Sequence, residues 1–431
     1  MRFDQIAGRA IAMIGAGMIL LRRWGAEASD PAMGSVPAIP QAKPQGIPTL
    51  KMPTAHGWKH GRKPQVAAGL KVNTFATGLK HPRSLLVLPN GDVLTAEARF
   101  LPGSIASPFD YAMFVTMKRA AAAGDSPNRI SILRDADGDG VAEVVEVFRD
   151  GLSQPFGTAL LGNTLYIGNV DELLAFDYTP GSLKLTGTGT SLARFKSGGH
   201  WTRSLILSPD QTKLYIGVGS DTNIADNGLE VEAGRACISE YDIASGSLRP
   251  FATGLRNPVG TAWHPDTGAL WTVVNERDGL GDETPPDYLT AVQDGGFYGW
   301  PYCYWGRFTD ARVPQDAAKV ASALTPDYAL GGHTASLGLA WMPAGTLPGF
   351  GDGMVIGQHG SWNRSKLSGY RVIHVPFENG RPSGPPRDIL SGFLSPDEKL
   401  SYGRPVGVCL KDGALLVADD VGDCIWRVTG A

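Results

Sequence analysis

Short apolar segments with alternating polar positions recur along the chain, separated by turns rich in glycine and proline. Each copy contains a strand, a Gly-Leu-x-x-Pro corner, a second strand, a turn and a third strand. The clearest copies are TFATGLKHPRSLLVLPNGDVLTAE, VFRDGLSQPFGTALLGNTLYIGNV and PFATGLRNPVGTAWHPDTGALWTVV. A period of two over short segments is typical of strands with one buried face, so the pattern predicts an all-β protein.

Weaker copies bring the number of repeats to six; they are GGHWTRSLILSPDQTKLYIGVGS, SLGLAWMPAGTLPGFGDGMVIGQHG and YGRPVGVCLKDGALLVADDVGDCIWRV. The spacing between copies varies, which favours a propeller with long loops over an open solenoid. The last copy ends after three strands, whereas a lone strand at 70–77 precedes the first corner. We therefore predict a six-bladed β-propeller in which residues 70–77 pair with 424–428 to close the last blade. Two helical stretches near 111–123 and 316–323 are expected as loop insertions.

The N-terminus has a different composition from the repeats. Arg2 and Arg9 precede an apolar run at 10–21, and Ala-Glu-Ala at 26–28 resembles a cleavage site, although two arginines at 22–23 are atypical of one. Residues 1–28 are therefore interpreted as a signal peptide or an uncleaved N-terminal anchor, and the protein as periplasmic or secreted. Residues 29–68 form a proline-rich linker, either a tether or an extended wrap over the surface, and 69–431 form the propeller.

Charge and cysteine content narrow the function classes. The formal net charge of −3 gives no general attraction to nucleic acid, and contact with a membrane is expected only through an N-terminal anchor. The four cysteines form no CxxC pair, which argues against a structural zinc or haem attachment. Export would permit disulfides, but the spacing does not indicate which cysteines pair.

Polar residues occupy the corners that lead into the innermost strands, where a propeller needs only glycine and proline. Arg256 and Asn257 lie at one corner, His200 at another, Arg404 at a third, and Arg364 lies in the fifth copy. Such corners gather at one end of the central channel. Guanidinium groups bind carboxylates through two hydrogen bonds, so this set predicts a pocket for a flat polyanion.

The succession GGHWTRS, KLYIGVGSDTN, GLRNPVG and GGFYGWP resembles the soluble quinoprotein glucose/sorbosone dehydrogenases over residues 69–431. The resemblance implies pyrroloquinoline quinone (PQQ) and calcium at the channel mouth. It implies that His200 is the general base and that Arg256 lies beside the reactive quinone carbonyl, with Asn257 next to it. It also implies that Arg404 binds a cofactor carboxylate, and that Arg364 takes the place of a cofactor-binding lysine.

The same resemblance places a catalytic calcium on backbone carbonyls of the loop NERDGLGDE, with Asp278 and Gly279 as the nearest equivalents. The chain departs from the glucose enzymes at two positions. Gly199 replaces an aspartate before the histidine, and Tyr402 replaces an arginine. The substrate is therefore expected to be an aldose, a sorbosone-like aldehyde or a polyol, and not necessarily glucose.

A second calcium site is predicted in RDADGDGVAEVVE. Asp135, Asp137, Asp139, Gly140 and Glu146 match positions 1, 3, 5, 6 and 12 of a calcium-binding loop, whose oxygen ligands suit a hard cation. The alternative is a hairpin turn rich in aspartate and glycine. If this loop binds calcium, the role is structural, away from the proposed pocket.

The leading hypothesis is an exported PQQ-dependent dehydrogenase that oxidises a sugar, sugar aldehyde or polyol and passes electrons to a quinone or a cytochrome. A lactonase-type propeller hydrolase is the first alternative, but it requires acidic residues at several corners where this chain has arginine and asparagine. The second alternative is a propeller that binds a ligand without catalysis.

Overall fold

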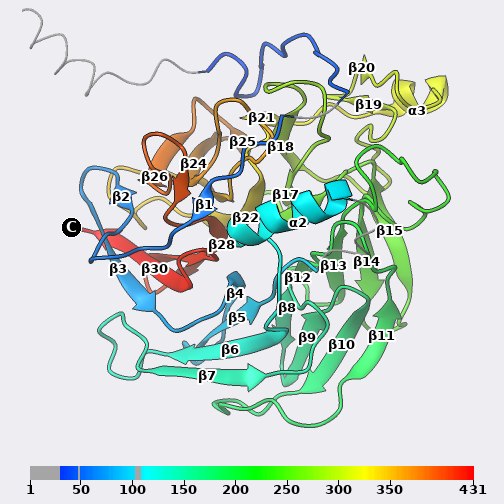
Figure 1. The fold of residues 1–431 in the computed structure, drawn as a ribbon. Helices are drawn as coiled ribbons and strands as arrows, with labels where there is room; N and C mark the ends of the chain where they lie inside the picture. The colour runs from blue at the N-terminus through cyan, green and yellow to red at the C-terminus, as the bar shows by residue number, and fades with distance from the viewer. Residues whose placement is uncertain (1–29, 47–48, 102–107) are drawn as a thin grey trace, which may run out of the picture.

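The computed structural model describes residues 30–46, 49–101 and 108–431, and six four-stranded antiparallel arrays form a ring (Figure 1). We number these blades 1 to 6 along the chain. Blade 1 consists of β4 (Pro82–Val87), β5 (Val93–Glu97), β6 (Arg129–Arg134) and β7 (Val144–Arg149). Blade 2 consists of β8 (Thr158–Leu161), β9 (Thr164–Gly168), β10 (Glu172–Asp177) and β11 (Thr190–Arg194). Blade 3 consists of β12 (Leu205–Leu207), β13 (Lys213–Val218), β14 (Cys237–Asp242) and β15 (Leu248–Thr253).

Blades 4 to 6 complete the ring. Blade 4 consists of β16 (Pro258–Trp263), β17 (Leu270–Val274), β18 (Pro286–Ala291) and β21 (Tyr328–Gly332). Blade 5 consists of β22 (Ser336–Met342), β23 (Gly353–Gln358), β24 (Arg371–Glu378) and β26 (Arg387–Ser391). Blade 6 consists of β28 (Pro405–Lys411), β29 (Ala414–Asp419), β30 (Cys424–Gly430) and β3 (Leu70–Ala76). Short strands outside this pattern are β1 (Thr54–Ala55), β2 (Gln65–Val66), β19 (Cys303–Tyr304), β20 (Phe308–Thr309), β25 (Arg381–Pro382) and β27 (Leu400–Ser401).

The first strand of the propeller closes its last blade, which confirms the prediction from the phase of the repeat. β3 pairs antiparallel with β30, with Leu70 opposite Gly430 and Thr74 opposite Trp426. Glycine in the innermost strands lets neighbouring blades approach closely. A Cβ atom on Gly338 would lie 2.1 Å from the Val406 carbonyl oxygen, and one on Gly407 would lie 2.4 Å from that of Arg83. Backbones at this separation leave no space for a side chain.

The two helices of the described residues are insertions between strands, close to where the sequence predicts them. α2 (Pro108–Arg119) lies between β5 and β6, and α3 (Ala317–Ser322) lies between β20 and β21. Asp316 caps α3, because its carboxylate accepts hydrogen bonds from the backbone N–H groups of Ala318 and Lys319. In Figure 1, α2 crosses the centre of the ring, and it is therefore placed over one end of the channel.

The proline-rich segment lies against blades 4 to 6. Gly34 bridges to Ala329 in blade 4, β1 pairs with β27, and β2 extends the outer edge of blade 5. The predicted signal peptide or anchor at 1–28 lies outside the described residues. No helix within the described ranges is long and apolar enough to span a membrane. All four cysteines are free thiols, so none of them forms a disulfide in this structure.

Candidate active site

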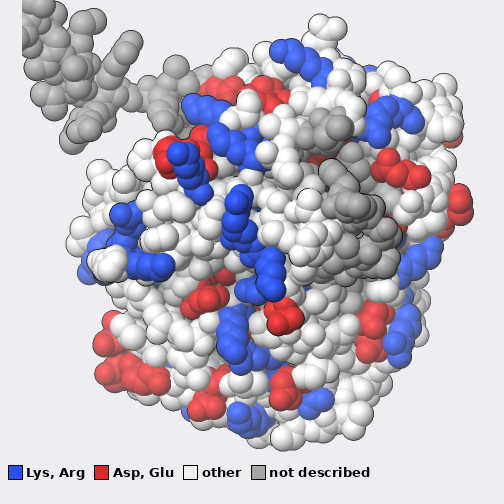
Figure 2. Space-filling model, viewed as in Figure 1, with Lys and Arg blue, Asp and Glu red and all other residues white. Residues whose placement is uncertain are grey.

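A cavity of about 660 Å³ lies where the innermost corners meet, and four of the predicted residues line it: His200, Arg256, Asn257 and Arg404. Each of them precedes the innermost strand of its blade. Within a blade, the second strand runs antiparallel to the innermost strand and ends at the edge where the innermost strand begins. The loops that follow the second strands therefore also reach the cavity. Figure 2 shows lysine and arginine interspersed with aspartate and glutamate over the viewed face. Charges of both signs are therefore mixed on that face.

The ring of His200 is held in one tautomer. Its Nδ1 lies 2.9 Å from the backbone carbonyl oxygen of Ser220, which can only accept a hydrogen bond, so Nδ1 carries the proton. Nε2 is then the unprotonated nitrogen. Burial lowers the pKa of His200 to about 3, and the charge of Arg256 acts in the same direction. The imidazole is therefore neutral near pH 7 and can accept a proton at Nε2.

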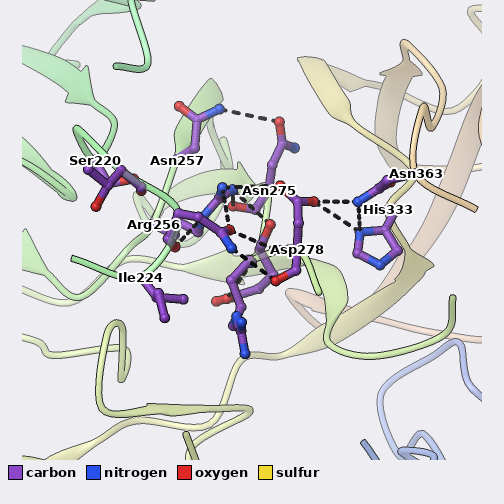
Figure 3. A network of polar contacts seen from close by, with 12 residues as sticks. Ser220, Ile224, Arg256, Asn257, Asn275, Asp278, His333 and Asn363 are labelled. Atoms are coloured by element: carbon purple, nitrogen blue, oxygen red, sulfur yellow. Dashed lines mark hydrogen bonds and ion pairs between the residues drawn. The ribbon is translucent and has the colours of Figure 1, made fainter. Parts of the chain in front are cut away.

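Arg256 is almost completely buried, and four hydrogen bonds and an ion pair tie its guanidinium to protein acceptors (Figure 3). Nε donates to the Asn223 carbonyl at 3.0 Å and Nη2 to the Asn223 Oδ1 at 3.0 Å. Nη1 donates to the carbonyl oxygens of Glu276 and Asn275 at 2.8 and 3.4 Å, and Nη2 lies 3.5 Å from the Asp278 carboxylate. Arg256 thus joins the loop after β13 to the loop after β17.

Asp278 lies at the centre of this network in Figure 3. Its Oδ1 accepts a hydrogen bond from Asn363 Nδ2 at 2.5 Å and lies 3.4 Å from His333 Nδ1. Burial opposes ionisation of the carboxyl group, but the hydrogen bond with His333 and the charge of Arg256 outweigh burial and lower the pKa of Asp278. The carboxylate is therefore ionised and faces the cavity.

Three buried oxygen atoms of cavity-lining residues have no hydrogen-bond partner: Asn257 Oδ1, Glu276 Oε1 and Asn363 Oδ1. Burial raises the pKa of Glu276 to about 7. Unsatisfied buried acceptors are costly, and a bound cation or a ligand N–H or O–H group would satisfy them. The side of the cavity around Asp278 therefore has the donor set of a site for a hard, oxygen-coordinated cation.

Arg404 contributes a cation on the other side of the cavity. Its Nε and Nη2 donate to the carbonyl oxygens of His359 and Gly360 at 3.0 and 2.8 Å, and these bonds leave Nη1 available. Nε2 of His359 in turn donates a hydrogen bond to the Asp420 carboxylate at 2.7 Å, and the same carboxylate is paired with Arg83. Burial and the charge of Arg404 lower the pKa of His359 to about 4.

Two of the predicted residues, Arg364 and Gly279, are not among the residues that line the cavity. Arg364 donates from Nη1 to the Gly332 carbonyl at 2.9 Å and pairs with Glu283. The Gly279 carbonyl accepts a hydrogen bond from the Gln45 backbone at 2.9 Å, and that of Asp278 accepts one from Asn223 Nδ2 at 3.0 Å. Both Asp278 and Asn223, which donates to its carbonyl, line the cavity, whereas Gly279 does not.

The two departures from the glucose enzymes have structural reasons. A Cβ atom on Gly199, which has φ +54°, would lie 2.4 Å from the backbone of Asp221. Asp221 itself is one of the residues that line the cavity. Tyr402 packs on the N-terminal segment, with the Arg62 guanidinium 4.1 Å from its ring centre.

The acidic loop between β6 and β7 is assembled differently from the prediction. Carboxylate oxygens of Asp135, Asp137, Asp139 and Glu143 lie within 4.8 Å of one another. Glu146 is not part of this group: it belongs to β7 and lies 3.6 Å from Lys184. Position 12 of a calcium-binding loop normally lies on a helix, whereas here Glu146 lies on the extended strand β7. Glu143 is therefore the fourth carboxylate of the group.

Sequence reasoning missed cavity residues that follow the second strands of blades 3 to 5. They are Asp221, Thr222, Asn223, Asn275, Glu276, His359 and Asn363. It also missed His333, which lines the cavity and follows β21. The signal was present as polar clusters directly after apolar strands, such as SDTN after β13 and NERD after β17.

Comparison with known proteins gives a consistent assignment. The model of the TrAA12-like family matches residues 133–430. A pyrroloquinoline quinone-dependent sugar dehydrogenase of Hypocrea jecorina is 24% identical over 63% of this chain and 64% of its own length. An uncharacterized protein of Borreliella burgdorferi is 28% identical over 64% of this chain and 76% of its own length.

The PQQ domain of pyranose dehydrogenase from Coprinopsis cinerea, solved in its holo form, has a TM-score of 0.67 and 21% identity. That comparison covers 88% of this chain and 100% of the other, and at this identity it supports the propeller fold alone. The family match covers well over half of the sequence and includes every cavity residue from His200 onward. The chain therefore belongs to the TrAA12-like family.

Proposed function

We propose that this protein is a PQQ-dependent dehydrogenase that oxidises a sugar, sugar aldehyde or polyol outside the cytoplasm. The observation that carries the proposal is the neutral His200, with its unprotonated Nε2, in one cavity with Arg404 and the Asp278 carboxylate. The names of the relatives, a sugar dehydrogenase and a pyranose dehydrogenase, support the same substrate class.

The residues present fit a quinone tricarboxylate together with a divalent cation. Nη1 of Arg404 would bind a carboxylate, and Asn257 and Thr222 supply further polar contacts. The unpartnered oxygens of Glu276 and Asn363, with Asp278, would hold calcium. When bound, the quinone supplies the two-electron acceptor that no side chain provides.

The chain's own residues bind, orient and deprotonate the substrate. Nε2 of His200 accepts the proton of the substrate hydroxyl, while the Ser220 carbonyl keeps the ring in the required tautomer. Arg256 is a positioning residue, because its four hydrogen bonds and its ion pair hold Asn223 and the Asn275–Asp278 loop. Anionic groups bound nearby would raise the pKa of His200 towards its ordinary value.

A metal-dependent hydrolase is less well supported. Such a site needs several carboxylates free to bind metal, but both oxygens of Asp287 already accept hydrogen bonds, from the Glu276 backbone and from Thr334 and Ala335. Within the described part of the cavity, Glu276 is the acidic residue with an unpartnered buried oxygen.

Reconstitution tests the proposal. Purified protein is mixed with PQQ and calcium, cofactor absorption is recorded, and reduction of a soluble dye is measured with a panel of aldoses and polyols. His200→Asn should retain the bound-cofactor spectrum and lower turnover by roughly 10²- to 10⁴-fold, the contribution of a positioned base. His60→Asn, at an exposed position with φ +56°, is the matched control. Absence of both cofactor binding and dye reduction would refute the proposed function.

A further inference from the structure

One wall of the cavity is apolar and is built by segments outside the repeat. Met52 comes from the N-terminal segment, Phe100 from the loop after β5, and Met113, Phe114 and Met117 from α2. We name these five residues the apolar cover. In Figure 1, α2 lies across the centre of the ring, and its inner residues line the same cavity as the polar residues.

The sequence of α2 explains why this face points inward. Met113 and Met117 are four residues apart and lie on one side of the helix, and with Phe114 they are partly buried. Tyr111 and Val115 lie on the outer side, 61% and 47% exposed. Methionine and phenylalanine offer no strong hydrogen-bond donor or acceptor, so a hydroxyl group beneath them finds no partner.

This wall is a poor match for an unsubstituted monosaccharide, which carries hydroxyl groups all round its ring. A hydroxyl buried against the cover would lose its water, whereas an alkyl or aryl group would gain contact there. We propose that the preferred substrate is a sugar or polyol that carries an apolar substituent remote from the oxidised carbon, an inference that rests on the proposed function. The substituent packs against Met113, Phe114 and Met117, and the hydroxyl groups face the polar residues.

Matched substrates test the inference with reconstituted holoenzyme and a soluble dye as acceptor. Glucose is compared with 6-O-butylglucose, and galactose with 6-O-butylgalactose, so that C1 is the same within each pair. We expect kcat/KM to be at least about 10-fold higher for the butyl ethers, since one methylene group in an apolar pocket is worth about that much. Met113→Gln with Met117→Gln should bring the ratio close to one, while Tyr111→Gln with Val115→Gln on the outer face should leave it unchanged.

Calorimetric binding of 6-O-butylglucose to the same variants gives a readout that does not depend on turnover, and it should weaken only for the inner-face pair. If that pair fails to fold, Met113→Gln alone is measured. Equal kcat/KM within the sugar pairs, or an unchanged ratio in the inner-face variant, would overturn the inference while leaving the dehydrogenase intact. If the inner-face variant changes only the KM for an apolar benzoquinone used as electron acceptor, the cover binds the acceptor and not the sugar, and the inference is also overturned. Oxidation of other sugars or polyols with no member of either pair oxidised would also overturn the inference, whereas failure to oxidise any sugar or polyol of the panel would instead refute the proposed function.

Discussion

Arg256→Lys tests whether the two loops of the cavity depend on one guanidinium. Arg256 makes five contacts, to two atoms of Asn223, to the carbonyls of Asn275 and Glu276, and to Asp278. Four of these contacts are hydrogen bonds, and a lysine ammonium has three donors on one nitrogen, so at least one hydrogen bond is lost. A hydrogen bond to a charged group contributes about 1.5–3 kcal/mol, which predicts a loss of at least about 1.5–3 kcal/mol.

The loss should appear locally, because the acceptors lie in loops and not in the blade strands. Amide hydrogen exchange of residues 275–280 and of 221–224 measures the opening free energy of both loops, and denaturant unfolding measures global stability. Arg249→Lys is the control: its side chain is 46% exposed, so replacing its pairs with Glu240 and Asp294 should cost about 0–1 kcal/mol. If Arg256→Lys stays within about 1 kcal/mol of the wild type and both loops remain protected, the positioning role is wrong.

Three further predictions concern stability. Asp420→Asn leaves Arg83 buried without its ionic partner and should cost about 3–5 kcal/mol in denaturant unfolding; a change below about 1 kcal/mol would contradict the pairing. Burial holds the pKa of His81 at about 3 and that of His359 at about 4, below the ordinary value of 6.5, so the unfolded chain binds more protons. Stability should therefore be full above pH 6.5 and decrease as the pH falls from 6.5 towards 4, and a constant Tm between pH 7 and 5 would count against neutral buried histidines. Calcium should raise the Tm of the wild type through the Asp135 loop, and Asp135→Asn with Asp137→Asn should reduce that rise; equal effects of calcium on both proteins would leave the alternative of a simple turn.

The fold was predictable because its signals are local and repeated. Alternating strands, Gly-Pro corners and the incomplete last copy all follow from short stretches, and together they specify the pairing of β3 with β30. Part of the cavity was predictable for the same reason, since His200, Arg256 and Arg404 all lie in corners that lead into an inner strand. Another part lies in loops of unequal length after the second strands, where no common spacing marks Asn223 or Asn363.

Side-chain direction was the other limit. The sequence does not show that Gly332 and Glu283 lie within reach of Arg364 and draw its guanidinium away from the cavity lining. Likewise, the spacing of Glu146 fits a calcium loop only if a helix follows, whereas pairing with β6 keeps residues 144–149 extended. In both cases a partner distant in the sequence decides the orientation, and a single sequence carries little information about such partners.

The cavity combines two kinds of structure with separate origins. The inner strands fix the polar residues rigidly, since glycines such as Gly338 and Gly407 bring adjacent backbones into contact. The apolar cover comes from an insertion and from the N-terminal segment, whose Lys51 backbone N–H donates to the Trp362 carbonyl at 2.8 Å beside the cavity. Substitutions in α2 or near Met52 can therefore alter which substrates fit without disturbing the strand register that positions His200. Because the reacting groups and the cover are carried by different elements, we expect substrate preference to change independently of the base and its tautomer.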